Sequence, residues 1–207
     1  MAEPVFKLFY FNFRGRGELI RLLLHTAQVE FIDERVAFAD WPELKPKTPE
    51  GYVPFMEIDG VAYGESLPLA RYIARKYNLM GKTELGQLTA DIIMNYVDDL
   101  RDEYVRFKTD KILTQLQKEE LEGKFSAETI PNFLGKIEKR LTNSSSGYLA
   151  GEDLSIADLT VADVLDTCIK EYPSVLDNFP NVSRHREMVM GLPQLAGYLA
   201  SRPDTKL

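Results

Sequence analysis

The stretch from Val53 to Ser66 constrains the fold more than any other part of this sequence. Two short apolar segments flank the dipeptide Asp59-Gly60, which favours the positive φ angles of a tight type I′ turn. Residues 54–58 and 61–63 are therefore predicted to form a β-hairpin. Ser66 stands where a helical spacing of apolar residues begins, and we expect its side chain to cap the first turn of that helix.

A strand edge, a hairpin and the start of a helix would meet in this stretch, which suits a small anionic peptide. An extended ligand could pair with the backbone of Val53 as an added strand. A ligand carboxylate could bind the N–H groups at Ser66 and the positive end of the helix dipole. The stretch by itself is equally compatible with a plain hairpin and a capped helix that bind nothing.

The residues before the hairpin predict a β-α-β unit. Residues 5–10 are rich in aromatic side chains and β-formers, which is typical of a strand. The segment 12–17 ends that strand, and the apolar spacing from Glu18 predicts a helix packed on one side. Residues 31–36 are predicted as a second strand, reached by a right-handed parallel crossover. The proline-rich segment 40–51 is predicted to be an irregular loop with one helical turn.

The pattern becomes helical after residue 77. Residues 78–83 have the composition of a linker, so we expect one domain over 1–77 and an all-helical domain over 84–207. A last helix is expected from Pro193. The other helices are marked by Leu85, Leu88, Ile92, Tyr96 and Leu100, by Ile130, Phe133, Leu134, Ile137 and Leu141, and by the capping signature Ser155-Ile156-Ala157-Asp158.

Composition narrows the classes of function. The net charge is −7 and the 25 basic residues are scattered among 32 acidic ones, which argues against nucleic acid as a partner. A lone cysteine, Cys168, excludes an intrachain disulfide and is expected to be a buried spacer. No signal peptide and no apolar run of ~20 residues is found, so we expect a cytoplasmic protein that does not enter a membrane. His25 and His185 have no further ligands at metal-binding spacing, so no metal site is expected.

With both halves placed, the sequence resembles the cytosolic glutathione transferases. The resemblance is strongest to the sigma class, which includes nematode enzymes and glutathione-dependent prostaglandin D synthase, and it covers essentially the whole chain. Its anchors are Leu8-Phe9-Tyr10-Phe11-Asn12-Phe13-Arg14-Gly15-Arg16-Gly17-Glu18, Asp40-Trp41, Val53-Pro54, Glu65-Ser66, Leu69-Ala70-Arg71-Tyr72, Ser155-Ile156-Ala157-Asp158 and Arg202-Pro203-Asp204-Thr205-Lys206-Leu207. No single anchor is decisive, and their joint order carries the resemblance.

The resemblance implies a thioredoxin-like N-terminal domain with a mixed four-stranded sheet, an all-helical C-terminal domain and a homodimer. It implies reduced glutathione as a co-substrate and no permanently bound cofactor. The catalytic residues would be Tyr10, which activates the thiol, and Arg16 nearby. The glutathione-binding residues would be Tyr10, Arg16, Trp41, Lys45, Val53, a cis Pro54, Glu65, Ser66 and, from the other subunit, Asp99. The hydrophobic substrate site would be lined by Phe11, Phe13, Arg14, Tyr104 and Leu207.

The sequence departs from the family pattern at four positions. Glu65 stands where the family often has Gln, which places a second negative charge beside a carboxylate-binding site. Tyr52 stands where the prostaglandin enzyme has Lys, and Arg106 stands where it has Trp. Asn95 replaces the first of its three metal-binding Asp residues. Prostaglandin synthesis and activation by divalent ions are therefore not carried over to this chain.

Glutathione must react as its thiolate, yet an unperturbed thiol has a pKa of ~8.5. Lowering that pKa by two units requires about 2.7 kcal/mol of preference for the anion. One hydrogen bond to a charged group contributes about 1.5–3 kcal/mol, so the Tyr10 hydroxyl could supply most of the shift as a neutral donor. By residue type alone, Tyr10 is better explained as a core aromatic side chain. The resemblance to the glutathione transferases instead favours the thiol-activating role of Tyr10.

We therefore expect an enzyme that conjugates the thiolate of glutathione to small hydrophobic electrophiles, as in detoxification. Two alternatives stay open. One is a non-catalytic carrier of hydrophobic ligands, or a structural protein, with the same fold. The other is a glutathione-dependent isomerase or peroxidase such as prostaglandin D synthase. The sequence does not rank electrophilic substrates, because variable side chains line the second pocket.

Overall fold

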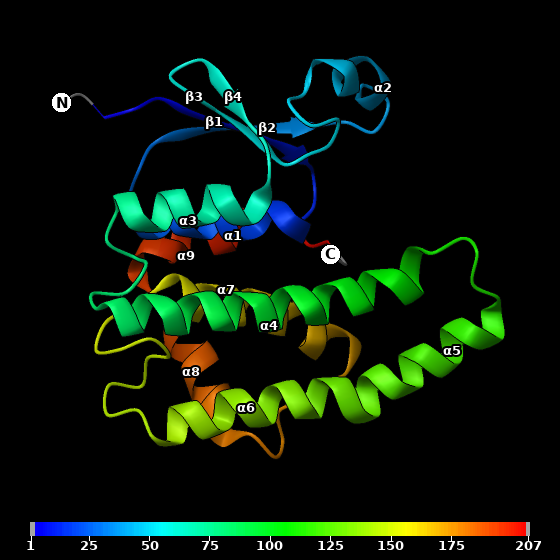
Figure 1. Cartoon of the computed structure of the whole chain (residues 1–207), viewed down its shortest axis with the longest axis vertical. Coiled ribbons are helices and arrows are strands. Elements are labelled where there is room, and N and C mark those ends of the chain that lie inside the picture. Colours follow the sequence, from blue (N-terminus) through cyan, green and yellow to red (C-terminus); the bar gives the residue numbers. More distant parts are fainter. Residues whose placement is uncertain (1–2, 206–207) are drawn as a thin grey trace. The chain divides into compact units, whose positions relative to one another are not determined.

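The computed structural model describes residues 3–205, which form two compact units (Figure 1). Among these residues, the first unit comprises 3–79 together with 190–205, and the second comprises 80–189. The last helix therefore groups with the N-terminal unit rather than with the helices of the second unit. The division into domains over 1–77 and 84–207 stays a prediction.

The first unit is built on a mixed four-stranded sheet. Its strands are β1 (Phe6–Phe11), β2 (Phe31–Val36), β3 (Phe55–Ile58) and β4 (Val61–Tyr63), in the spatial order β2-β1-β3-β4. β1 pairs with β2 in parallel and with β3 antiparallel, and β3 pairs antiparallel with β4. The predicted thioredoxin-like arrangement, a β-α-β unit followed by a β-hairpin and a helix, is confirmed.

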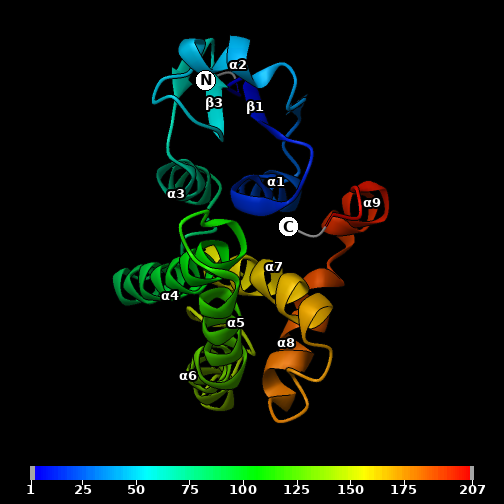
Figure 2. The same cartoon turned by 90° about the vertical axis from the view of Figure 1, so that its right-hand side faces the viewer.

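Helices α1 (Glu18–Thr26) and α3 (Ser66–Lys76) lie side by side under one face of this sheet (Figure 2). Phe6 and Leu8 of β1 are fully buried, as are the leucines of α1, so the core lies between the sheet and these helices. α9 (Pro193–Ser201) packs against α1. The loop predicted over 40–51 contains α2 (Trp41–Leu44) and the 3-10 turn η2 (Lys45–Lys47).

The hairpin turn forms as its sequence predicts. Asp59 has φ 51° and Gly60 has φ 82°, the two positive angles of a type I′ turn. The Asp59 side chain also accepts a hydrogen bond of 2.9 Å from the Val5 N–H through Oδ1. This bond ties the hairpin to the residue before β1.

The prediction that Ser66 caps α3 is wrong by one residue. Glu65 occupies the N-cap position, with φ 67°, and no side chain caps the helix there. The Glu65 carbonyl accepts the Leu69 N–H at 3.1 Å, so the helix already includes Ser66 in its first turn. Ser66 is buried at that position.

The second unit is entirely helical, as predicted. Its elements are α4 (Glu84–Thr109), α5 (Gln115–Lys124), the π-helical turn η3 (Phe125–Thr129), α6 (Ile130–Thr142), α7 (Ile156–Glu171) and α8 (Pro180–Met190). The five residues expected to mark α6 are all buried. α5 and α8 were not predicted. No helix of the described residues is both long and apolar enough to cross a membrane.

The apolar stripe predicted along α4 is only partly its buried face. Leu85 and Leu88 are exposed, and Leu100 is the one member of the stripe that is buried. The helix instead packs through Gly86, Ala90, Ile93, Met94, Val97, Leu100, Tyr104 and Phe107. A long helix with two apolar stripes does not reveal by spacing alone which stripe meets the core.

The predicted capping box before α7 is confirmed. Asp158 Oδ2 accepts the Ser155 N–H and the Ser155 hydroxyl, each at 2.7 Å. Asp158 Oδ1 accepts the Leu149 N–H at 2.8 Å and lies 2.9 Å from His185 Nε2. All three side chains, Ser155, Asp158 and His185, are buried. One carboxylate therefore joins the start of α7, the preceding loop and α8.

Candidate active site

Tyr10 lies near the end of β1 and is only 6% exposed. Its hydroxyl oxygen accepts a hydrogen bond of 3.0 Å from the Arg16 backbone N–H. Arg16 belongs to the 3-10 turn η1 (Gly15–Gly17), which leads directly into α1. The hydroxyl group therefore lies at the N-terminal end of α1, where the helix dipole favours negative charge. A hydroxyl oxygen that accepts an N–H keeps its own proton for donation.

Two glycines allow η1 to approach Tyr10 this closely. A Cβ atom on Gly15 would stand 2.5 Å from Tyr10 Oη, and φ at this residue is +43°. A Cβ atom on Gly17 would stand 2.7 Å from Tyr10 Cγ. Both positions are too close for any side chain, so the segment Gly15–Gly17 fits around the tyrosine only with glycine at its two ends. Sequence reasoning used these glycines only as the end of the strand and as part of the family anchor, and it assigned them no role beside Tyr10.

Arg21 holds the backbone that carries the site. It is fully buried on α1, and its guanidinium group donates to the carbonyls of Phe13 at 2.9 Å and Phe11 at 3.4 Å. The same group pairs with Asp33 of β2, and it lies 5.6 Å from the centroid of the Tyr10 ring. Sequence reasoning missed Arg21 because a lone arginine in an apolar helix has no motif around it.

Glu18 connects α9 to the start of α1. It is almost fully buried, and it accepts hydrogen bonds from the Tyr198 hydroxyl at 2.7 Å and from Arg202 at 2.8 Å. Arg21 lies 3.6 Å away on the next turn of α1. The Arg14 N–H also donates to the Thr205 hydroxyl at 3.3 Å. The C-terminal segment is thus bound to the loop that surrounds Tyr10.

Aromatic rings cluster beside Tyr10. Phe13 meets the Tyr10 ring edge-on, with ring centroids 5.2 Å apart, and Phe11 lies 5.9 Å from it. Trp41, at the start of α2, meets Phe11 edge-on at 5.6 Å. Phe38, which sequence reasoning missed, stacks on Phe11. Of the predicted hydrophobic-site residues, the structure thus brings together Phe11 and Phe13.

The residues predicted to bind the glutathione backbone lie elsewhere in the same unit. The Val53–Pro54 peptide bond is cis, as the resemblance implies, and it precedes β3 directly. Val53 packs against the buried cluster of Phe9, Val36 and Phe55. Glu65 and Ser66 lie at the N-terminal end of α3, and Lys45 is an exposed residue of η2.

Tyr104 and Asp99 belong to the helical unit. Tyr104 is buried on α4 against Phe107 and Phe125, with ring centroids 5.4 and 5.8 Å away. Burial raises the pKa of Tyr104, so its hydroxyl stays protonated at neutral pH. Asp99 is exposed, and in the described part of the chain it makes no hydrogen bond or ion pair. Leu207 lies outside the described residues.

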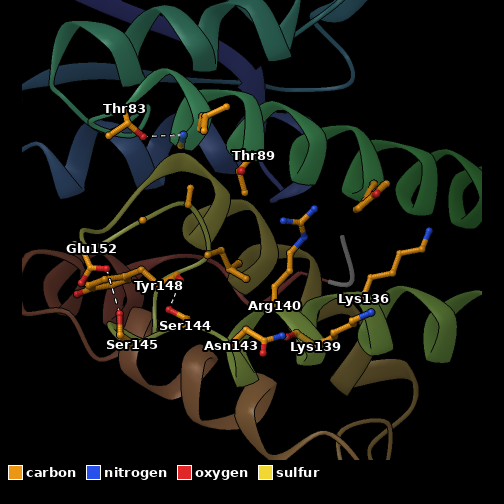
Figure 3. Close-up of a pocket in the computed structure, with 16 residues that line it drawn as sticks. Thr83, Thr89, Lys136, Lys139, Arg140, Asn143, Ser144, Ser145, Tyr148 and Glu152 are labelled. Carbon is orange, nitrogen blue, oxygen red and sulfur yellow. Dashed lines mark hydrogen bonds between the residues drawn. The ribbon is translucent and has the colours of Figure 1, made fainter.

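The helical unit contains a polar hollow of about 700 Å³ between α4, α6 and the loop that follows α6 (Figure 3). Arg140 extends into it from α6 towards α4, and Lys136 and Lys139 line it on the same helix. No predicted site residue lines this hollow. Asp99 instead lines a smaller one of about 210 Å³, beside Glu103 and Lys136.

Cys168 is buried on α7, as expected of a spacer. Burial raises the pKa of its thiol to about 12, so it is protonated at neutral pH and is no nucleophile. In the described residues, no three His, Cys, Asp or Glu side chains gather in a way that could hold a metal ion.

A thioredoxin-like unit with a tyrosine hydroxyl at a helix N-terminus, joined to an all-helical unit, defines the class of two-domain glutathione transferases. Family models agree. "Glutathione S-transferase, N-terminal domain" matches residues 16–83, and "Glutathione S-transferase, C-terminal domain" matches residues 98–202. The chain is 36% identical to Glutathione S-transferase 3 of Caenorhabditis elegans, over 97% of this chain and 98% of that protein.

Two further relatives place the chain near the sigma class. It is 31% identical to hematopoietic prostaglandin D synthase of Mus musculus, over 99% of this chain and 100% of that protein. The solved structure of the sigma class glutathione S-transferase of Fasciola hepatica superposes with a TM-score of 0.88, at 32% identity and with 100% of each chain covered. The chain therefore belongs to the glutathione S-transferase family, and it is of the sigma type.

Proposed function

We propose that this protein conjugates the thiolate of reduced glutathione to small hydrophobic electrophiles. The observation that carries the proposal is the position of the Tyr10 hydroxyl. Its oxygen accepts a hydrogen bond of 3.0 Å from the Arg16 N–H, just before the N-terminus of α1. A hydroxyl group that accepts one hydrogen bond can also donate one, so Tyr10 can donate a hydrogen bond to a bound thiolate. The enclosing glycines and the buried Arg21 fix the ring that carries this hydroxyl.

Tyr10 would lower the pKa of the glutathione thiol by stabilising only its anion. A hydrogen bond to a charged acceptor contributes about 1.5–3 kcal/mol, close to the roughly 2.7 kcal/mol that a shift of two pKa units requires. The positive end of α1 and the cationic Arg16 would supply the remainder. The thiolate sulfur then attacks the electrophilic carbon, and the thiol proton passes to solvent.

The rest of glutathione would bind to α2, to η2, to the segment before β3 and to the start of α3. The Val53 backbone before the cis Pro54 would pair with the cysteinyl residue as an added strand, and Trp41 and Lys45 would contact the glycine end. Ser66, in the first turn of α3, would bind the γ-glutamyl carboxylate, which suits the positive end of that helix. Glu65 would then face the γ-glutamyl ammonium group rather than the carboxylate.

We also propose a homodimer in which each site is completed by the other subunit. Asp99 is exposed on α4 and makes no ion pair with the described residues of its own chain, so its carboxylate is available to a ligand ammonium group. Phe11, Phe13, Arg14, Tyr104 and Leu207 would line the site for the hydrophobic electrophile. The cytoplasm is the compartment we propose, because glutathione is abundant and reduced there.

Isomerisation of a prostaglandin by the same thiolate is a second candidate. It is supported by the full-length likeness to the mouse synthase. Arg106 and Asn95, both exposed on α4, depart from the pattern of that enzyme and count against it. Conversion of prostaglandin H₂ to prostaglandin D₂ by the purified protein would favour this candidate.

Retention on immobilised glutathione, measured together with turnover of chlorodinitrobenzene, tests the main proposal. We expect both retention and turnover. Retention without turnover of any electrophile would favour a binding protein of the same fold. The absence of both would contradict the proposed function.

A heterodimer tests the action of Asp99 across the subunits. When a Tyr10→Phe subunit pairs with an Asp99→Asn subunit, one site carries both lesions and the other carries neither. We expect each verified heterodimer to recover about half of the wild-type activity. No recovery would place Asp99 in the site of its own subunit, and a monomeric protein with full activity would contradict the dimer.

A further inference from the structure

Phe38 is an aromatic residue that the fold holds at the surface of the first unit. It lies in the loop between β2 and α2, where the Asp40 N–H donates to the Ala37 carbonyl at 3.0 Å and closes a turn. The side chain is 69% exposed, yet its ring stacks on Phe11 with centroids 4.5 Å apart and planes 22° apart. One ring face is therefore covered by Phe11, and the rest of the ring meets solvent.

Phe38 extends a set of nearly parallel rings, Phe11, Phe13 and Phe38, which we call the aromatic layer. Phe13 lies 6.2 Å from Phe38 at 22°, and 5.6 Å from Phe11 at 23°. Phe13 also meets Tyr10 edge-on at 5.2 Å. The aromatic layer thus runs from the ring of the proposed thiol-activating residue to the surface of the unit.

Core packing does not explain why residue 38 is aromatic. Phe11 packs against the buried cluster of Phe9, Val36 and Phe55, whereas Phe38 stacks on Phe11 and is itself exposed. Because the ring remains mostly in water, its burial contributes little to folding. A solitary surface phenylalanine would need no explanation. This one instead lengthens an ordered layer that begins at Tyr10.

We propose that Phe38 is a specificity-determining residue that favours planar aromatic electrophiles over acyclic ones. The inference rests on the proposed function and names a substrate class for the same site. A flat, electron-poor ring can stack on the exposed part of the aromatic layer in the offset geometry that aromatic pairs prefer, whereas an acyclic electrophile cannot. With an aryl chloride, the sulfur of glutathione forms a C–S bond, chloride leaves with the electron pair of the C–Cl bond, and the thiol proton passes to solvent.

Replacing Phe38 by leucine separates stacking from mere apolar contact, because leucine keeps an apolar side chain but has no ring. Tyr63→Leu is the matched control, since Tyr63 is a 50% exposed aromatic residue of β4 outside the aromatic layer. Each variant is assayed with chlorodinitrobenzene and with allyl isothiocyanate, an acyclic electrophile that adds the thiol without a leaving group. Thermal unfolding of each variant is measured in parallel.

Phe38→Leu should lower kcat/KM for chlorodinitrobenzene by about threefold to tenfold, the size of one aromatic contact, mainly through KM. Its kcat/KM for allyl isothiocyanate should stay within about twofold of wild type. Tyr63→Leu should leave kcat/KM unchanged for both electrophiles. An equal loss with both electrophiles, or a loss with neither, would overturn the role of Phe38 while leaving the proposed function intact. A wild-type protein that conjugates neither electrophile would refute the proposed function, and this inference with it.

Discussion

Replacing Gly17 by alanine tests how tightly the start of α1 holds the Tyr10 ring. The alanine Cβ would stand 2.7 Å from Tyr10 Cγ and 3.1 Å from Tyr10 Cβ, so either the ring or the helix must move. The backbone of Gly17, at φ −84° and ψ −21°, is in the right-handed helical region, which alanine adopts without strain. The steric contact with Tyr10 is therefore the one unfavourable effect that the substitution introduces.

The two energies involved oppose each other. Alanine restricts the unfolded chain and would stabilise the protein by about 0.4–1 kcal/mol if the site were roomy. Overpacking a filled site costs about 1–3 kcal/mol, so we expect a net destabilisation of about 1–2 kcal/mol. A displacement of a catalytic group by about 1 Å lowers the rate by about 100-fold, so turnover at neutral pH should fall at least tenfold.

A double-mutant cycle with Tyr10→Phe distinguishes the two effects. Phenylalanine keeps the ring and therefore the steric contact, so Gly17→Ala should cost the same unfolding free energy in either background. Its effect on kcat should vanish in the Tyr10→Phe background, where no hydroxyl remains to be displaced. Urea unfolding and steady-state kinetics measure the two quantities.

Gly135→Ala is the matched control, because the Cβ that it would add on α6 meets no atom within 4 Å apart from the adjoining backbone of the same helix. It should stabilise the protein by about 1 kcal/mol, the helix preference of alanine over glycine, and leave activity unchanged. A Gly17→Ala protein that is as stable and as active as wild type would refute the reasoning about the Tyr10 setting.

Three other predictions concern Asp158, Cys168 and His25. Asp158→Ala leaves the Leu149 and Ser155 donors and His185 without their shared acceptor, and should cost about 3–5 kcal/mol of unfolding free energy in urea; a cost below 1 kcal/mol would contradict this. Cys168 should react with a thiol reagent only after unfolding, because burial raises its pKa to about 12, and fast labelling of the native protein would refute that. Burial lowers the pKa of His25 below its ordinary 6.5, so the unfolded state takes up the proton first and stability should fall as pH drops through 6.5, levelling off below the folded pKa. His25→Gln should flatten that slope, and an unchanged slope would exclude His25 as its source.

The elements that the sequence predicts well are those defined by local chemistry. Asp59-Gly60 requires positive φ angles and forms the expected turn, and Ser155 with Asp158 forms the expected capping box. Both depend on residues within three positions of one another. Neighbouring side chains decide such features before any tertiary contact forms, so their prediction needs no knowledge of the fold.

The features that the sequence missed depend on packing or lack an apolar face. α5 buries no residue, so it carries no periodic signal, although the capping box of Thr114 and Gln117 at its start could have revealed it. α8 buries only Val182, His185 and Val189. The roles of Arg21 and Phe38 depend on contacts that only the folded chain makes, the hydrogen bond of Arg21 to Phe13 and the stacking of Phe38 on Phe11. Ser66 lies inside α3 because Glu65, with its positive φ, precedes the helix. A positive φ is not expected of a glutamate, so the residue type did not predict it.

The titration of bound glutathione tests the central claim most directly. The ultraviolet absorbance of the thiolate, followed against pH in the binary complex, reports the pKa of the bound thiol. The thiol bound to wild-type protein should show a pKa about two units below the ~8.5 of a free thiol. In Tyr10→Phe that pKa should rise most of the way back to the free value, while the affinity for glutathione stays nearly unchanged. The same lowered pKa in both proteins would contradict the account, because Tyr10 would then take no part in stabilising the thiolate.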